Sequence, residues 1–378
     1  MLTAAKQTVQ AEKFSFTSSI EADVWHEKAS AKAFEWWYFD ALSEDGRDAV
    51  VIIFLDNFIF SPRYNAKNSK QEKFLERIKN KLLRRNGEHN YNLFPAIAFT
   101  YYRDGKAKYR AINEFSPEDF SASEKSPSCQ IGRNFFRLEA APYGSGYALS
   151  INAKLRKNRN LEAHFEWLSV ESDFLPDKSV NLNDAHIWNL AVSRADVTGK
   201  ISVSDDNEKS LDTIHFRGTG YHDHNLDNRW LPKTVSDWEW GRAHFSDVTA
   251  VFYRYKERGE DYSTTKLLIV QYGNLCERDA AFDAQNFRRD KFGIKYPKNL
   301  QFIAEDNVRL SVKQMKIIDS SFFYLRFLSE MTLNLPDGTE RKAVGITEYL
   351  APKALKYQWL DWLTNMRIGR DGQGAFLK

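Results

Sequence analysis

The stretch DTIHFRGTGYHDHN, residues 212–225, begins with the residue types of a β-strand and ends in three titratable side chains, His222, Asp223 and His224. In a strand, alternate residues share a face, so Tyr221 and Asp223 should point one way and the two histidines the other. Three interpretations are open. The side chains form a metal site, a buried polar group that satisfies the backbone where a strand ends, or a carboxyl group kept protonated in an aromatic cavity.

The composition is that of a globular protein rich in aromatic side chains. Hydrophobic residues make up 42% of the chain and aromatic residues 14%. Its 378 residues are enough for two domains and a sizeable core. Phe (27), Tyr (17) and Trp (10) are abundant while Met (4) is scarce. Large aromatic side chains contribute much burial and often line apolar cavities.

The charge and the cysteines limit the partners and the compartment. A net charge of +3 is too small to argue for binding to nucleic acid, and we expect none. Cys129 and Cys276 lie far apart and form no CxxC pattern, which fits a reducing compartment. Residues 1–30 lack the apolar core of a signal peptide, and no segment approaches the roughly 18 apolar residues that span a bilayer. We therefore expect a soluble, cytoplasmic protein.

Short β-strands are the pattern of most of the chain. Runs rich in β-branched and aromatic residues are separated by turn signals such as EDG and RDG. The clearest runs are EWWYFDA (35–41), DAVVIIFLDNFIF (48–60) and FPAIAFTYY (94–102), followed later by WEWGRAHF (238–245) and VTAVFYRYKE (248–257). So many short strands, with almost no long helical stretch, predict an all-β protein built as a sandwich or barrel.

A recurring triplet weakly indicates two related halves. Phe34-Glu35-Trp36 opens the first series of strands and Trp238-Glu239-Trp240 opens the second, although Phe165-Glu166-Trp167 lies between them. Pro232 and its polar neighbours mark a boundary within residues 228–237. The predicted division is an N-terminal arm over residues 1–30, a first β domain over 31–232 with an insertion at about 66–92, and a second β domain over 233–378.

Residues 70–85, KQEKFLERIKNKLLRR, break the β pattern. Seven Lys or Arg and two Glu surround one apolar helical face formed by Phe74, Leu75, Ile78 and Leu82. Such a basic amphipathic helix can lie on an anionic membrane surface, which would make the protein peripheral to the inner membrane. The alternative is a solvated insertion that packs its narrow apolar stripe on the barrel.

His222 and His224 form a His-x-His pair, which can bind zinc or iron when a third ligand joins it. His186, His215 and His244 are available, but nothing in their spacing indicates that they converge on the pair. We therefore expect no bound metal.

Four stretches carry a resemblance to a known family: FEWWYFDA (34–41), FSPRYN (60–65), GTGYHDHN (218–225) with WEWGRAHF (238–245), and GITEYL (345–350). In these stretches the chain resembles the carotenoid 1,2-hydratases, also called hydroxyneurosporene synthases, and the wider AttH-like group. The stretches extend over residues 34–350, so the resemblance covers nearly the whole chain.

The resemblance implies two lipocalin-like, calycin-type antiparallel β-barrel halves with a short basic helical insertion and an active cavity at or near their junction. It implies hydration of a terminal carbon–carbon double bond of an acyclic carotenoid or other isoprenoid, without a cofactor. The acid of the family falls on Asp223, a tyrosine on Tyr221 and, through a looser match, a tryptophan on Trp188. Further substrate contacts are expected from His222, His224, Trp36, Tyr38 and Trp240.

Two other functions remain open at this point. Lipocalin-like folds include cyclases and pericyclases of secondary metabolism, which depend on the shape of the cavity more than on one acid. A non-catalytic carrier of a lipophilic ligand would use Asp223 only as a structural group.

The basic segment gives a first prediction. If Phe74, Leu75, Ile78 and Leu82 dock on lipid, the protein should co-sediment with anionic liposomes and be released by high salt, because salt screens the attraction between surface charges. Sedimentation in parallel with neutral vesicles is the control. Equal pelleting with both vesicles, or none with either, would leave residues 70–85 as a packed insertion.

Overall fold

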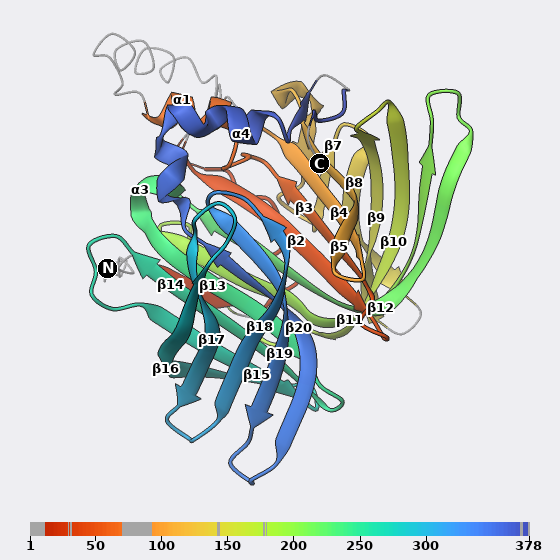
Figure 1. Cartoon of the computed structure of the whole chain (residues 1–378). Helices are drawn as coiled ribbons and strands as arrows, with labels where there is room; N and C mark the ends of the chain where they lie inside the picture. Colours follow the sequence, from red (N-terminus) through yellow and green to blue (C-terminus); the bar gives the residue numbers. More distant parts are fainter. Residues whose placement is uncertain are drawn as a thin grey trace, which may run out of the picture.

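Two β-sheets, formed by successive parts of the chain, make up the architecture and lie against each other (Figure 1). The structure is a computed structural model that describes residues 12–28, 30, 32–69, 93–141, 144–176, 178, 180–370 and 373–376. The basic segment 70–85 and its apolar stripe lie outside these residues.

The first sheet contains thirteen strands among the described residues, in the order β21-β5-β4-β3-β2-β12-β11-β10-β9-β8-β7-β6, with β1 added beside β11. Its strands are β1 (Phe14–Thr17), β2 (Phe34–Ser43), β3 (Asp48–Leu55), β4 (Ala96–Arg103), β5 (Lys106–Glu114), β6 (Phe120–Ala122), β7 (Ser128–Ile131), β8 (Asn134–Ala141), β9 (Gly144–Leu155), β10 (Arg159–Ser172), β11 (His186–Ser204), β12 (Ser210–Asp227) and β21 (Gly369–Arg370). The sheet curls on itself, so that the backbone N–H of Lys154 on β9 donates to Oδ1 of Asn113 on β5 (3.2 Å) although these strands are not neighbours in the sheet.

The second sheet is a closed antiparallel barrel in which each strand pairs with the next and the last pairs with the first. Its strands are β13 (Val235–His244), β14 (Val248–Glu257), β15 (Thr264–Gln271), β16 (Asn274–Arg289), β17 (Lys295–Ala304), β18 (Arg309–Ser320), β19 (Tyr324–Asn334) and β20 (Glu340–Leu350). Inward-facing residues such as Phe252, Leu267 and Phe302 fill its core. Closure removes the unpaired strand edges that an open sheet has to protect.

Helical structure in the described part of the chain is short. It consists of α1 (Pro62–Ser69), α3 (Leu231–Thr234), α4 (Asp361–Asn365) and the 3₁₀ turns Pro117–Asp119, Pro352–Lys356 and Gln358–Leu360. Within the residues that the structure describes, none of these helices has the length and apolarity needed to cross a membrane.

Strand β2 explains why EWWYFDA is so rich in aromatic residues. One of its faces, with Trp37 and Phe39, belongs to the core enclosed by the curled first sheet. The other, with Trp36 and Tyr38, belongs to a second core shared with the barrel. A strand that is covered on both faces has a continuous run of apolar residues, whereas a strand with one exposed face alternates apolar and polar residues.

The contact between the two sheets combines stacked rings with a buried ion pair. The rings of Trp36 on β2 and Trp238 on β13 stack with centroids 5.4 Å apart. Arg242 on β13 donates from Nε to Oδ1 of Asp40 on β2 (2.8 Å), and both side chains are buried. One residue of each recurring triplet, Trp36 and Trp238, therefore meets the other across the interface.

The end of the chain returns from the barrel to the first sheet. After β20, the chain runs through α4 to β21, which pairs in parallel with β5 and is fixed there by an ion pair from Arg370 to Glu114 (2.8 Å). The last elements of the sequence thus belong to the first sheet in space.

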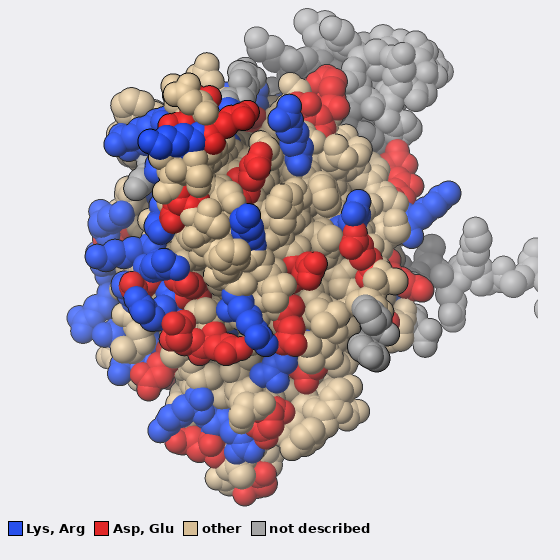
Figure 2. Space-filling model, turned by 90° about the vertical axis from the view of Figure 1, so that its right-hand side faces the viewer, with Lys and Arg blue, Asp and Glu red and all other residues tan. Residues whose placement is uncertain are grey.

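The charges on the face shown in Figure 2 are mixed. Acidic and basic side chains alternate over most of this face, and basic side chains gather toward one edge of the view. This distribution agrees with the small net charge of +3.

The expected all-β fold of two antiparallel halves is confirmed, with one difference in detail. The second half is a closed barrel, whereas the first is a curled half-barrel whose end strands, β6 and β21, do not pair. Each of these strands is very short, and β21 occupies the outer edge of β5 where a closing strand would have to bind. The predicted domain division at residues 232 and 233 stays a prediction.

The buried ion pair gives a second prediction. Arg242→Ala should lower the free energy of unfolding by about 3–5 kcal/mol, because Asp40 would keep a buried charge without a partner. The measurement is urea denaturation followed by tryptophan fluorescence.

Two further variants serve as controls for Arg242→Ala. Arg341→Ala breaks the partly exposed pair with Asp247 and should change the free energy by no more than about 1 kcal/mol. The double variant Arg242→Met/Asp40→Leu should recover most of the loss, since neither charge is then left alone. An equal effect of Arg242→Ala and Arg341→Ala would contradict the role given to the buried pair.

Candidate active site

Strand β12 separates its side chains as the alternation predicts. It runs to Asp227, beyond the point where the sequence pattern appeared to end, and pairs with β2 and β11. Tyr221 belongs to the core shared with the barrel, and Asp223 bonds to it on that side. His222 stacks on Phe39, inside the first sheet.

Asp223 is buried and accepts three hydrogen bonds. The Tyr221 hydroxyl (2.8 Å) and Trp188 Nε1 (3.0 Å) donate to its Oδ2, and Asn225 Nδ2 (3.1 Å) donates to its Oδ1. Burial raises the pKa of Asp223 to about 7, against the opposing effect of the bonds from Tyr221 and Trp188. A substantial fraction of this carboxyl group is therefore protonated near neutral pH.

The predicted catalytic residues Asp223, Tyr221 and Trp188 are thus brought together. Burial also raises the pKa of Tyr221 well above its ordinary value, so its hydroxyl remains a hydrogen-bond donor. Trp188 reaches Asp223 from β11, the strand paired with β12. Trp188 from β11 and Tyr221 and Asp223 from β12 therefore form one hydrogen-bonded group.

Aromatic rings surround this group. Trp240 packs on Tyr221 (5.1 Å between centroids), and Tyr253 stacks on Trp188 (4.6 Å). Tyr38 meets both Tyr221 and Trp240 edge to face. Aromatic faces carry negative charge density, so this enclosure favours a positive charge formed inside it.

A cavity of about 230 Å³ lies between the sheets. Asp223, Tyr221 and Trp188 do not line it, and Tyr38 stands between the cavity and Tyr221. Of the predicted substrate contacts, Trp36 and Tyr38 line it directly, and Trp240 lies behind Tyr38. Aliphatic residues of β3 and β4 and the aromatic residues Trp238 and Phe323 complete an apolar wall. Tyr38 connects the cavity to Tyr221 and, through it, to Asp223.

His222 and His224 do not reach the cavity. His222 Nε2 lies 2.8 Å from Asp23 Oδ2, and His224 stacks on Trp37 (4.7 Å) with its Nε2 3.2 Å from Glu35 Oε1. The structure therefore places both histidines in the core of the first sheet, on the face of β12 opposite Asp223. Neither histidine is therefore placed to make the predicted contact with a substrate in this cavity.

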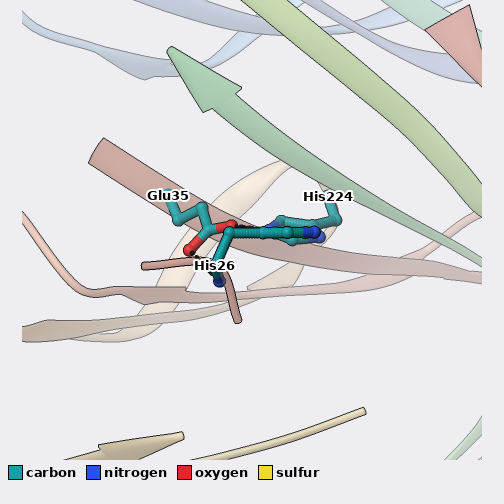
Figure 3. A group of neighbouring side chains, drawn as sticks. All are labelled: His26, Glu35 and His224. Atoms are coloured by element: carbon teal, nitrogen blue, oxygen red, sulfur yellow. Dashed lines mark hydrogen bonds and ion pairs between the residues drawn. The ribbon is translucent and has the colours of Figure 1, made fainter. Parts of the chain in front are cut away.

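His224 nevertheless has neighbours that its sequence spacing did not indicate. His26, Glu35 and His224 present ligand atoms within 4.8 Å of one another (Figure 3), and two imidazoles with a carboxylate are ligands that zinc uses. Glu35 already has a cation, because the buried Lys28 Nζ lies 2.7 Å from its Oε2. Burial alone would raise the pKa of Glu35, but Lys28 and the two histidines hold it well below its usual range.

The cavity wall also contains charged residues that the sequence did not lead us to expect there. Arg326 and Glu348 form an ion pair at its wall (2.8 Å), and Arg110 and Asp319 form another (2.9 Å). A signal for Glu348 was present in GITEYL, where it alternates with Ile346 and Leu350 on the apolar face of the strand. His186, which had no expected partner, lies with Nε2 2.6 Å from the Tyr253 hydroxyl.

Comparisons with known proteins agree with this architecture. A family model described as carotenoid hydratase CrtC matches residues 168–376. A hydroxyneurosporene dehydrogenase of Chlorobaculum tepidum is 28% identical over 367 residues, which cover 94% of this chain and 92% of the relative.

Two solved structures share the fold. An AttH-like protein of Nitrosomonas europaea has a TM-score of 0.54 at 12% identity and covers 88% of this chain and 95% of its own. CghA has a TM-score of 0.52 at 12% identity and covers 90% of this chain and 97% of its own. At such low identity these two likenesses concern the fold alone.

The histidine cluster gives a third prediction. The purified protein should contain no stoichiometric zinc or iron, because the ammonium group of Lys28 repels a metal ion at Glu35. Elemental analysis of protein prepared without chelators measures this. One metal ion per chain that His224→Ala removes and His222→Ala retains would contradict the prediction and identify the His26–Glu35–His224 group as its site.

Proposed function

Because this chain belongs to the carotenoid hydratase CrtC family, whose model matches more than half of its residues, it is a hydratase, and we propose how it acts. It adds water to a terminal carbon–carbon double bond of an acyclic carotenoid or similar isoprenoid. Asp223 is the acid, and the aromatic rings around it stabilise the cation that forms.

The burial of Asp223 among aromatic rings is the observation that carries this proposal. A general acid works best when its pKa lies near the operating pH, and burial raises the pKa of Asp223 to about 7. Tyr221 and Trp188 hold the carboxyl group in one orientation through hydrogen bonds to the same oxygen. A buried acid surrounded by rings suits a substrate that offers only a hydrocarbon double bond.

The reaction proceeds through a carbocation. Asp223 transfers its proton to the less substituted carbon of the double bond, which leaves a tertiary cation on the neighbouring carbon and a carboxylate on Asp223. The faces of Trp188 and Tyr221 stabilise this cation through their quadrupoles, in a site from which bulk water is largely excluded. A water molecule then forms the new carbon–oxygen bond and releases a proton, so that the sum is the addition of one water.

Substrate has to pass Tyr38 to reach the acid. Tyr38 lines the cavity and its ring contacts that of Tyr221, so we assign it the position between the bound hydrocarbon and the acid. The apolar walls of the cavity suit the end of a polyene chain. The name of the Chlorobaculum relative also refers to a hydroxylated carotenoid, which supports this class of substrate.

The test of this proposal is the variant Asp223→Asn, our fourth prediction. Asparagine keeps the size of the side chain but has no acidic proton, so turnover should fall by about 10²- to 10⁴-fold while the melting temperature changes little. Hydration of an acyclic carotene with unmodified terminal isoprene units, quantified by mass spectrometry, is the measurement. Asp212→Asn, a partly exposed position on the same strand, is the matched control.

Two more readouts separate catalysis from structure. In deuterated water the product should carry one deuterium on the carbon beside the new tertiary alcohol. The wild-type rate should fall as the pH rises through about 7, because the acid form of Asp223 is lost there. The proposal would be contradicted by an unlabelled product or by an oxidised product without added oxygen. It would also be contradicted if Asp223→Asn lost activity only in proportion to its loss of stability.

A further inference from the structure

Two ion pairs, Arg326–Glu348 and Arg110–Asp319, lie in the wall of a cavity that is otherwise mostly apolar, and the first of them is the one nearer Tyr38 and Trp240. Arg326 on β19 and Glu348 on β20 both line this cavity, and both are buried. Glu348 follows Ile346 and precedes Leu350 on the same apolar face of its strand. Because buried ion pairs are often no more stabilising than apolar residues of the same size, stability gives little reason to keep charges here.

The contacts of Arg326 fix the position of the carboxylate. Its Nε donates to Glu348 Oε1 (2.8 Å) and its Nη1 donates to the hydroxyl of Tyr102 on the first sheet (2.9 Å). Its guanidinium group also lies near the ring of Tyr38, 5.8 Å from the centroid. Glu348 is therefore held at the cavity wall near the residue through which substrate approaches Asp223.

The carboxylate also borders the Asp223 group through a second path. Glu348 is paired directly with Trp240 across strands β20 and β13. Nε1 of Trp240 donates to the Tyr221 hydroxyl (3.4 Å), which in turn donates to Asp223. The charge of Glu348 is close enough to contribute to the raised pKa of Asp223, after the larger effect of burial.

The two carboxyl groups thus have opposite environments. Asp223 is enclosed by rings and neutral donors, whereas Glu348 has a guanidinium partner. Two neighbouring carboxyl groups with such different partners are an arrangement that can divide acid and base work. A hydration needs both, since one proton is delivered to carbon and another is removed from water.

We infer that Glu348 is the general base of the reaction, which holds the water that captures the cation and accepts its proton. This inference rests on the proposed function. As the oxygen of water bonds to the tertiary carbon, one of its O–H bonds breaks and the proton passes to the Glu348 carboxylate. Asp223 was left ionised by the first step, so exchange of one proton through solvent restores both groups. Arg326 is a positioning residue that orients Glu348.

The experiment, our fifth prediction, compares hydration with isotope exchange in deuterated water. Asp223 can deliver a deuteron and then remove a proton from the same carbon, which returns labelled alkene without adding water. Glu348→Gln should slow hydration by about 10²-fold or more, because the water has lost its base. Exchange into recovered substrate should stay within a few-fold of wild type, so the ratio of exchange to hydration should rise by about 10²-fold. Glu330→Gln, an exposed position on β19, is the control.

Each result decides between the possible roles of Glu348. Unchanged hydration in Glu348→Gln, or hydration and exchange that fall together, would overturn the inference. If Glu348→Gln does not fold, Glu348→Asp keeps a carboxylate but misplaces it. A raised ratio of exchange to hydration in that variant supports the inference, and a wild-type ratio overturns it. If the wild-type protein neither hydrates nor labels the carotene, the proposed function itself is wrong, and so is the role of Glu348 as its base.

Discussion

The buried pair between Arg242 and Asp40 is the constraint on which the relation of the two sheets depends. Stacked rings such as Trp36 and Trp238 can slide over one another at little cost, whereas a desolvated ion pair has one satisfactory arrangement. The pair joins β2 to β13, the two strands that also carry the rings beside the cavity. Together with the hydrogen bond between Arg326 and Tyr102 and the ion pair between Arg110 and Asp319, it fixes how far the barrel residues lie from the Asp223 group.

Strand β12 places two kinds of polar chemistry on its two faces. On one, Asp223 has uncharged donors and aromatic rings, and burial raises its pKa to about 7. On the other, His222 and His224 join Asp23, Glu35 and Lys28 in a network of charges within the first sheet. Successive side chains of an extended strand point to opposite faces of the sheet. Asp223 is therefore adjacent to His222 and His224 in the sequence but lies on the other side of the sheet.

Local features of the sequence predicted much of this arrangement. Alternation in GTGYHDHN placed Tyr221 and Asp223 on one face, and the aromatic run EWWYFDA indicated a strand. Features that depend on distant parts of the chain were not predictable in this way. The approach of His26 and Glu35 to His224 arises from a loop and a neighbouring strand, and the short β21 decides that the first sheet stays open. Glu348 was visible as an acid on an apolar face, but its guanidinium partner could be assigned only from the pairing of β19 with β20.

The return of the chain from the barrel to the first sheet has a consequence for the order of folding. Strands β2 to β12 leave the ribosome before the barrel does, yet β5 receives its outer partner only when residues 369 and 370 have been made. Four residues that line the cavity also belong to this last segment: Leu363, Thr364, Arg367 and Ile368. Contacts between residues so far apart in sequence form late, because their loops cost entropy to close. The nascent chain should therefore complete its barrel while the cavity is still open on one side, with apolar rings exposed until the final residues close it.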